Sequence, residues 1–128
     1  MSIKKSSIKK ISGSLSTKVK GKLAERWVAV VLWLHGWRLL ATNLKTPEAE
    51  IDLVCDDGSG MVIVEVKYRT NYWARPLTNA QLNRLARAAE ALQTRLRTPP
   101  GSLRQGVRID LIFLVRCGCR IRWHHYRG

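Results

Sequence analysis

The segment MVIVEVK at residues 61–67 decides the fold, because a glutamate and a lysine interrupt a run of apolar residues. Such a run is typical of a buried β-strand, and residues two apart in a strand point to the same face of the sheet. Glu65 and Lys67 are therefore predicted to emerge side by side, with the three valines of the segment on the opposite face. Burying a charged group is costly unless it is paired or binds a metal ion. The segment therefore predicts a functional site at the centre of a small sheet.

A second acid, Asp52, lies in the apolar run that precedes this segment. The sequence DDGSG at residues 56–60 predicts a tight hairpin turn, which makes the strands on either side of it antiparallel neighbours. We expect this hairpin to bring Asp52 close to Glu65. Two carboxylates at short range repel each other strongly unless a cation or a proton lies between them.

The alternation of side chains along the earlier strand assigns its residues to two faces. Strict alternation places Glu50 and Asp52 on one face of the sheet, and Ile51 and Leu53 on the other. We expect the first pair to be available to a ligand and the second pair to be part of the core.

These residue types suit phosphodiester hydrolysis. This reaction needs an activated water, a counter to the phosphate charge and help for the leaving oxygen, and Mg²⁺ or Mn²⁺ held by carboxylates can serve all three needs. Asp52 and Glu65 are hard oxygen ligands, and the carbonyl of Val66 could add a third. Lys67 could orient the attacking water and stabilise charge in the transition state. The alternative is a structural Glu65–Lys67 pair on a solvated edge, with Asp52 as a surface acid.

Composition points to a polyanionic partner. The chain has 128 residues, which favours a single domain, and its formal net charge is +14. Nucleic acid is the commonest explanation for such a charge, and DNA is favoured over RNA here. A merely basic surface is the alternative. The longest apolar run, residues 27–34, is too short to span a bilayer, so no membrane partner is expected. Three cysteines without a disulfide framework suit the reducing cytoplasm.

The pattern of apolar residues predicts the elements in the order α-β-β-β-α-β-β, after a basic flexible arm at residues 1–17. This arm is interpreted either as a tail that grasps nucleic acid or as a solubilising extension, and residues 18–128 as a single domain. The first predicted helix is at 18–35, with Gly36 as its C-terminal stop and with the apolar stripe Leu23, Trp27, Val30, Val31 and Leu34. The second follows an N-cap at Thr78, with the stripe Leu82, Leu85, Ala89 and Leu92. The predicted strands are at 37–42, 50–55, 61–69, 107–115 and 120–126.

Asp52 followed by Glu65-Val66-Lys67, on adjacent strands after a long helix, resembles the PD-(D/E)XK nuclease superfamily. This superfamily has the restriction-endonuclease-like fold and includes Holliday junction resolvases. More narrowly, the chain is similar to the YraN family of small bacterial proteins over residues 21 to 126. The matching segments are EIDLV at 50–54, VEVKYR at 64–69, GWRLLATN at 36–43, RL at 84–85 and RIDL at 108–111.

The resemblance implies an α/β fold with an α-β-β-β-α-β core and a mixed central sheet flanked by helices. It implies Asp52 and Glu65 as metal ligands, Lys67 as the catalytic lysine, and Glu25 as an accessory acid that holds a second metal ion or a water. The family commonly has lysine and glutamine early in the second helix. Gln81 and Leu82 occupy these positions here.

Five residues are predicted to contact nucleic acid around this centre, and they are Arg69, Trp73, Arg75, Gln81 and Arg84. The tryptophan could stack on an unpaired base or pack onto the core, and the arginines could bind phosphate or form a solvated helix face. Arg108 and Asp110 share a face of their strand and are interpreted as a structural pair.

Together these observations predict a Mg²⁺- or Mn²⁺-dependent endonuclease that acts on DNA, including branched or single-stranded DNA. Pairing of two copies would suit the cutting of both strands. One alternative is a non-catalytic nucleic-acid-binding module with a decayed nuclease site, and another is an interaction protein with a basic surface.

Overall fold

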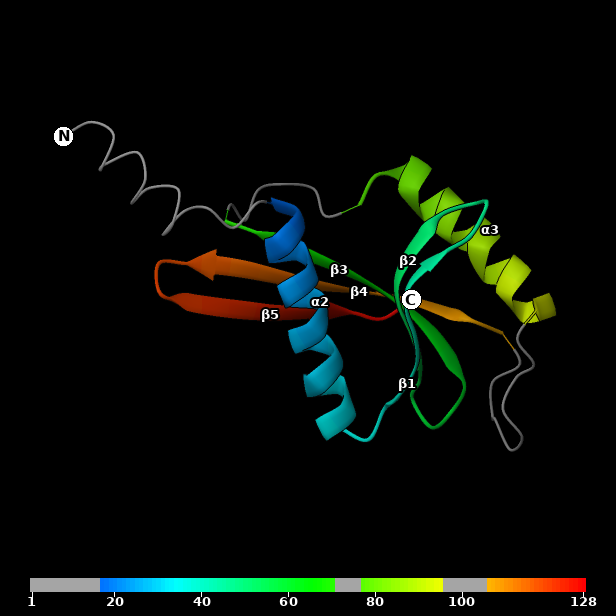
Figure 1. The fold of residues 1–128 in the computed structure, drawn as a ribbon, viewed down its shortest axis with the longest axis horizontal. Helices are drawn as coiled ribbons and strands as arrows, with labels where there is room; N and C mark the ends of the chain where they lie inside the picture. The colour runs from blue at the N-terminus through cyan, green and yellow to red at the C-terminus, as the bar shows by residue number, and fades with distance from the viewer. Residues whose placement is uncertain (1–16, 71–76, 96–105) are drawn as a thin grey trace.

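The structure, a computed structural model, describes residues 17–70, 77–95 and 106–128. In these ranges two helices and five strands follow in the predicted order (Figure 1). The elements are α2 (Thr17–Leu34), β1 (Arg38–Lys45), β2 (Glu50–Asp56), β3 (Met61–Arg69), α3 (Asn79–Arg95), β4 (Arg108–Cys117) and β5 (Arg120–Tyr126). The bounds of β3 and β5 are those predicted, whereas β1 and β4 run further than expected at their C-terminal ends. The division into an arm at 1–17 and a domain at 18–128 stays a prediction, because residues 1–16 lie outside the described ranges.

The strands form one mixed sheet in the order β1-β2-β3-β4-β5. Three neighbouring pairs are antiparallel, and β3 with β4 is the parallel pair. The parallel ladder runs from Val62 opposite Arg108 to Arg69 opposite Val115. A parallel connection needs a crossover, and the segment that carries α3 supplies it. The fold class is therefore the predicted α/β arrangement of a mixed sheet flanked by helices.

Two apolar clusters show that the helices cover opposite faces of the sheet. Ala24, Val28 and Leu32 of α2 pack in one cluster with the β3 residues Val62, Val64 and Val66. Residues of α3 pack in the other cluster with Met61 and Ile63. In β3 the predicted alternation is therefore confirmed, with the valines facing α2. The central strand β3 is shielded on both sides, which is why a charged group on it has little water around it.

The predicted apolar stripe of α2 was wrong. Leu23, Trp27, Val30 and Leu34 are all between 46% and 69% exposed, whereas Ala24 and Val28 are buried. The helix is apolar around much of its circumference, so helical spacing alone fits two overlapping stripes. The stripe that is buried includes the small side chain of Ala24, which packs in the cluster with the β3 valines.

The C-terminus of α2 is fixed by a Schellman motif at Gly36, as the glycine there predicted. The N–H of Gly36 donates to the carbonyl of Trp33 (2.9 Å), and the N–H of Trp37 donates to the carbonyl of Leu32 (3.0 Å). Gly36 has φ of 88°, a left-handed conformation that favours glycine. The buried side chains of Leu32 and Trp37 join the same cluster, so this motif also anchors the start of β1.

The predicted N-cap of α3 is confirmed and extends to a reciprocal capping box. The N–H of Gln81 donates to Oγ1 of Thr78 (3.2 Å), and the N–H of Thr78 donates to Oε1 of Gln81 (3.0 Å). The predicted apolar stripe needs one correction, because Leu82 is 41% exposed while Ala88 is fully buried. Leu82 lies in the first turn of the helix.

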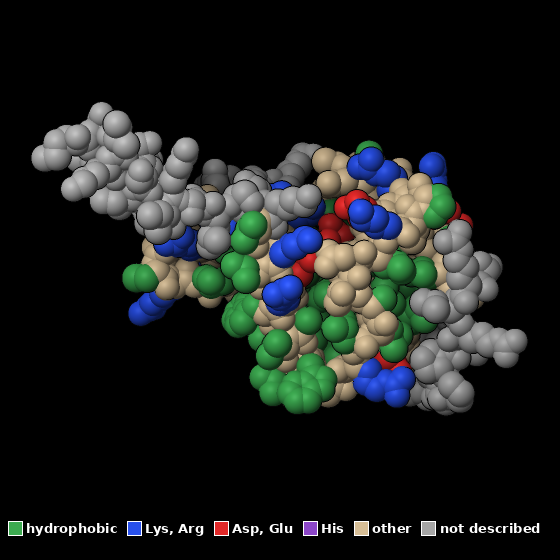
Figure 2. Space-filling model, in the orientation of Figure 1, with side chains coloured by type: hydrophobic (Ala, Val, Ile, Leu, Met, Phe, Trp, Pro, Cys, Tyr) green, Lys and Arg blue, Asp and Glu red, His purple; other side chains and the backbone are tan. Residues whose placement is uncertain are grey.

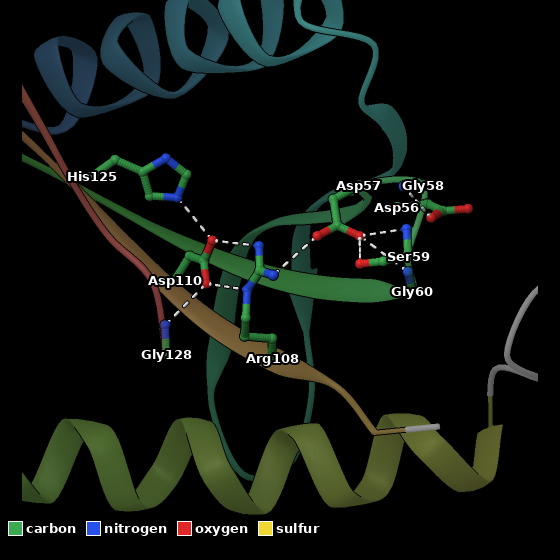
Figure 3. A network of polar contacts seen from close by, with 9 residues as sticks. All are labelled: Asp56, Asp57, Gly58, Ser59, Gly60, Arg108, Asp110, His125 and Gly128. Carbon is green, nitrogen blue, oxygen red and sulfur yellow. Dashed lines mark hydrogen bonds and ion pairs between the residues drawn. The ribbon is translucent and has the colours of Figure 1, made fainter. Parts of the chain in front are cut away.

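The predicted structural pair of Arg108 and Asp110 is the centre of a buried polar network (Figure 3). Arg108 donates to both carboxylate oxygens of Asp110, from Nε at 2.7 Å and from Nη2 at 3.0 Å. Its Nη1 also pairs with Asp57 of the β2–β3 turn at 3.0 Å. Nε2 of His125 and the N–H of Gly128 lie within hydrogen-bond distance of Asp110, at 2.8 and 3.2 Å. The network thus ties β4 to the β2–β3 turn, to β5 and to the C-terminal residue.

In the described ranges, neither helix combines the length and the apolar character that crossing a membrane requires.

Candidate active site

The candidate site lies where the pairing between β2 and β3 ends. The antiparallel ladder runs from Asp56 opposite Met61 to Leu53 opposite Val64. One position further along, the Oδ2 atom of Asp52 accepts a hydrogen bond from the N–H of Val66 at 2.8 Å. A side-chain oxygen thus takes the place of a strand carbonyl, which holds the Asp52 carboxylate beside β3.

One predicted feature of β2 was wrong at this point. Ile51 packs in the cluster with α3, whereas Leu53 packs in the cluster with α2, so the two residues do not share a face. The alternation changes where β2 stops pairing with β3, because the ladder no longer fixes the pleat there. The consequence is that Asp52 can reach toward α2.

Three acids from three elements meet at this break in the ladder. Asp52 lines one cavity with Glu25 of α2 and Glu65 of β3, and its negative charge contributes to the raised pKa of both glutamates. Carboxylates at such short range repel each other, which favours a cation or a proton between them. The predicted approach of Asp52 and Glu65 is therefore confirmed, and Glu25 also joins them.

Burial and mutual repulsion change the proton affinity of two of these acids. Burial, followed by the charge of Asp52, raises the pKa of Glu65 from 4.5 to about 8. The same causes raise the pKa of Glu25 from 4.5 to about 7, against the opposing charge of Lys22. Carboxyl groups that have a shifted pKa and line a cavity are typical of functional sites.

Lys67 lies beside Glu65, as the spacing of the two residues predicted. Its Nζ is 3.5 Å from Oε1 of Glu65, and the two side chains are only 18% and 12% exposed. The lysine lowers the pKa of Glu65, but burial and Asp52 have the larger effect. A single ammonium group therefore does not compensate the charge of the acids around it.

The acids have spare oxygen atoms that fit a hard cation. Oε2 of Glu25 and Oε2 of Glu65 are buried, and neither accepts a hydrogen bond from the residues that the structure describes. An unpartnered buried oxygen is costly, and a bound cation would remove that cost. Across residues 17–70, 77–95 and 106–128, no three Asp, Glu, His or Cys side chains are already arranged as a metal cage. Mg²⁺, however, keeps several waters and commonly takes only one or two carboxylates, so this donor set fits it.

A cavity of ≈ 620 Å³ opens in front of these acids, below the first turns of α2. Its lining includes the three acids, Lys67, Arg69 and Gly21. A side chain at Gly21 would meet nothing within 4 Å, so this glycine leaves the space under the helix open. Figure 2 shows acidic side chains among lysine and arginine side chains on the face of the molecule that α2 crosses.

The structure divides the residues predicted to contact nucleic acid. Arg69 lines the large cavity, and its Nη1 donates to the carbonyl of Tyr68 at 3.0 Å. Gln81 and Arg84 line a smaller cavity of ≈ 190 Å³ that reaches Glu65 from the side of α3. The side chain of Gln81 also closes the capping box, so its carbonyl oxygen is already used. Trp73 and Arg75 lie outside the described residues.

Some residues of the site were not predicted. Asn43 lines a cavity with Glu25, lowers the pKa of that acid and has φ of 48°, a conformation that asparagine adopts more readily than most residues. An asparagine within a strand is the signal that could have identified it. Lys20 and Tyr68 also line the large cavity. Their types and positions in the sequence give no comparable signal.

The fold matches that of a solved Holliday junction resolvase. The structure of Hjc from Archaeoglobus fulgidus, a Holliday junction resolvase from an archaeal hyperthermophile, aligns with a TM-score of 0.51. The alignment covers 80% of this chain and 72% of that chain, at 19% sequence identity. This likeness shows the fold, which is the predicted restriction-endonuclease-like arrangement.

Sequence comparison defines the family. The model of the "Uncharacterised protein family UPF0102" matches residues 24–115. A UPF0102 protein of Renibacterium salmoninarum is 38% identical over 120 residues, which cover 89% of this chain and 98% of that protein. A UPF0102 protein of Sphingopyxis alaskensis is 37% identical over 104 residues, which cover 78% and 84% of the two chains. The chain therefore belongs to the UPF0102 family, the YraN-like group that its motifs resemble.

Proposed function

We propose that this protein is a Mg²⁺- or Mn²⁺-dependent endonuclease that hydrolyses phosphodiester bonds of DNA, with branched or single-stranded DNA as its substrate. The observation that carries the proposal is the meeting of Glu25, Asp52, Glu65 and Lys67 at one opening of a fold shared with a Holliday junction resolvase. A net charge of +14 supports a polyanionic substrate.

The roles follow from the contacts. Asp52 and Glu65 would hold the metal ion, with the Val66 carbonyl as a further oxygen ligand and Glu25 as the accessory acid. When bound, the ion would supply a Lewis acid and a lowered pKa for water. Lys67 would orient the attacking water and donate to the charge that develops on phosphate, because its Nζ is already held at 3.5 Å from Glu65.

The surrounding residues would position the substrate. Arg69 would contact phosphate from the rim of the large cavity, and Gln81 and Arg84 from the rim of the smaller one. Trp73 and Arg75 remain part of the proposal as contacts from the segment after β3. Two copies of the chain acting together would account for cutting of both strands, and the cytoplasm is the proposed compartment.

The test is cleavage of labelled single-stranded, duplex, flapped and four-way-junction DNA with Mg²⁺ or Mn²⁺. We expect cutting that stops with EDTA and in the variants Lys67→Ala and Glu65→Gln. Glu90→Gln is the matched control, because Glu90 is an exposed acid on α3, and this variant should cut like the wild type. Cutting that persists in Lys67→Ala would indicate a contaminating nuclease and contradict the proposed site.

Metal binding gives a readout that does not depend on activity. Titration with Mn²⁺, followed by calorimetry, should detect binding to the wild type that is lost in Asp52→Asn. Asp56→Asn, an acid on the same strand that lies away from the large cavity, should retain it. Salt-sensitive DNA binding without any metal binding or cleavage would instead support a nucleic-acid-binding module with a decayed nuclease site.

A further inference from the structure

Two further cavities adjoin the candidate site on the flank of α2 that faces the β4–β5 hairpin. The first, of ≈ 250 Å³, shares Lys20 and Tyr68 with the large cavity of the site. The second, of ≈ 380 Å³, shares Trp27 with the first. Shared lining residues place the three cavities in one row. Figure 1 shows α2 lying across this part of the sheet, with β4 and β5 passing beneath it.

Aromatic rings line the far part of this row. Trp27 is 46% exposed, and its ring meets that of Trp123 edge to face, with 5.5 Å between centroids and 73° between planes. Trp37 and His125 form the adjoining wall, with their centroids 5.8 Å apart. His125 is in turn held by the fully buried Asp110. The rings are therefore held by their neighbours before a ligand binds. Stacking on them would cost little side-chain conformational entropy.

The charges along the row have one sign. Lys20 and Arg116 line the first additional cavity, and Arg127 lines the second, while none of the described acids lines either of them. A second copy of this chain would bring the same positive rim into contact with itself, at a net charge of +14 for each copy. A polyanion with flat apolar groups complements both the charge and the rings, and unpaired nucleic acid has this composition.

We propose that the row of cavities is a binding track for an unpaired strand of DNA that leads into the candidate site. This inference rests on the proposed nuclease function and names the part of the substrate that reaches the acids. Bases of the strand stack on Trp27 and Trp123, and its phosphates pair with Lys20, Arg116 and Arg127. The strand passes below the first turn of α2, through the space that Gly21 leaves open.

The length of the track sets the number of nucleotides. Lys20 and His35 mark its ends along α2, and a helical rise of 1.5 Å per residue makes this span about 22 Å. At the stacked spacing of about 3.4 Å, this corresponds to roughly six or seven nucleotides, and to fewer when the strand is stretched. We therefore expect affinity for oligothymidylate to rise with length and to level off at roughly six or seven nucleotides.

The experiment measures fluorescence anisotropy of labelled oligothymidylate with the full chain in EDTA, so that binding is separated from cleavage. Trp27→Ala should weaken binding roughly tenfold, because stacking on an aromatic side chain is worth that much per base. Arg116→Gln should also weaken binding and reduce its salt dependence. Trp33→Ala is the matched control, because Trp33 is on the same helix, is 66% exposed and lines none of the three cavities. It should leave binding unchanged.

The outcomes separate this inference from the nuclease proposal. Unchanged binding in Trp27→Ala, or an equal loss in Trp33→Ala, would overturn the track even if the protein cuts DNA. A change of oligomeric state in Trp27→Ala, seen by light scattering, would show a protein interface instead and would also overturn it. Loss of binding in Trp27→Ala alone, with binding retained in Lys67→Ala, would support the track even if no cleavage is found.

Discussion

Asp110 is fully buried, yet its charge is matched by donors on several sides. Burial on its own raises the pKa of this carboxyl group. The hydrogen bonds from Arg108, His125 and the Gly128 N–H outweigh burial and hold the pKa below its ordinary value of 3.8. A depressed pKa in the folded state means that Asp110 stabilises the fold above pH 3.8, and that this contribution is lost as the pH falls below it.

Asp110→Asn tests this network. We expect it to lower the free energy of unfolding by about 2–4 kcal/mol at pH 7, because the buried Arg108 loses a charged partner. The stability of the variant should also fall less steeply than that of the wild type in acid. Urea denaturation at pH 7 and pH 3 measures both effects. Asp56→Asn is the control. Asp56 pairs with the exposed Arg38 at 4.0 Å, so this variant should lose at most about 1 kcal/mol of unfolding free energy.

In the metal-free protein, Glu65 changes the stability with pH in the opposite direction to Asp110. Its pKa is raised from 4.5 to about 8, so the folded state binds a proton in that window that the unfolded state releases. The stability of the fold therefore decreases as the pH rises from 4.5 to 8. Glu65→Gln should remove this loss and raise the free energy of unfolding by roughly 1–3 kcal/mol at pH 9.

Denaturation in EDTA at pH 5 and pH 9 checks this prediction, with Glu90→Gln as a control that should show no such gain. A variant that is less stable than the wild type at pH 9 would mean that Lys67 already compensates the charge of Glu65. The wild type, but not Glu65→Gln, should also gain stability when Mn²⁺ is added.

At this scale the sequence predicted the acids well and their surroundings poorly. The spacing of Glu65 and Lys67 and the turn after β2 were enough to bring Asp52, Glu65 and Lys67 together. The change of face between Ile51 and Leu53 depends on where a ladder ends, which strand periodicity does not encode. The contact of Asn43 with Glu25 depends on how α2 lies over β1, and such a long-range contact has no local signal.

Among the elements, α2 shows most clearly where local patterns are insufficient. Its existence and its end at Gly36 follow from composition and from a glycine stop. Its buried face does not, because the helix has apolar residues on several sides and the sheet selects the side with Ala24 and Val28. In α3 the apolar stripe is narrower, and three of its four predicted residues are buried.

Two glycines of this region predict opposite effects of the same substitution. Gly36→Ala should destabilise the protein by about 1–2 kcal/mol, because alanine is strained at φ of 88°. Gly21→Ala should stabilise it by about 0.5–1 kcal/mol, because Gly21 is inside α2, where alanine is the better helix former. No described atom lies within 4 Å of either new methyl group. Steric clashes therefore do not contribute to the difference in stability between the two variants. Thermal denaturation of the two variants measures the contrast, and a loss of stability in Gly21→Ala would contradict it.

For the whole molecule, the net charge of +14 predicts how the proposed DNA binding should respond to salt. The proposed arm carries Lys4, Lys5, Lys9 and Lys10. If these lysines bind phosphate, replacing all four with glutamine should reduce the slope of log affinity against log salt by about 3 on single-stranded DNA. Binding titrations between low and moderate salt measure the slope, and deletion of residues 1–16 should give the same result with an unchanged melting temperature. An unchanged slope would identify the arm as a solubilising extension.

The parallel ladder between β3 and β4 has a consequence for how the chain folds during its synthesis. The β2–β3 and β4–β5 hairpins join residues that are near in the chain, whereas this ladder joins distant ones such as Val62 and Arg108. Distant pairings form slowly, so docking of β4 is expected to limit the folding rate. Glu25, Asp52, Glu65 and Lys67 are all synthesised before β4. The nascent chain therefore carries the candidate site before its five-stranded sheet is complete, and we expect the geometry of the site to be fixed only after β4 has been made and has paired with β3.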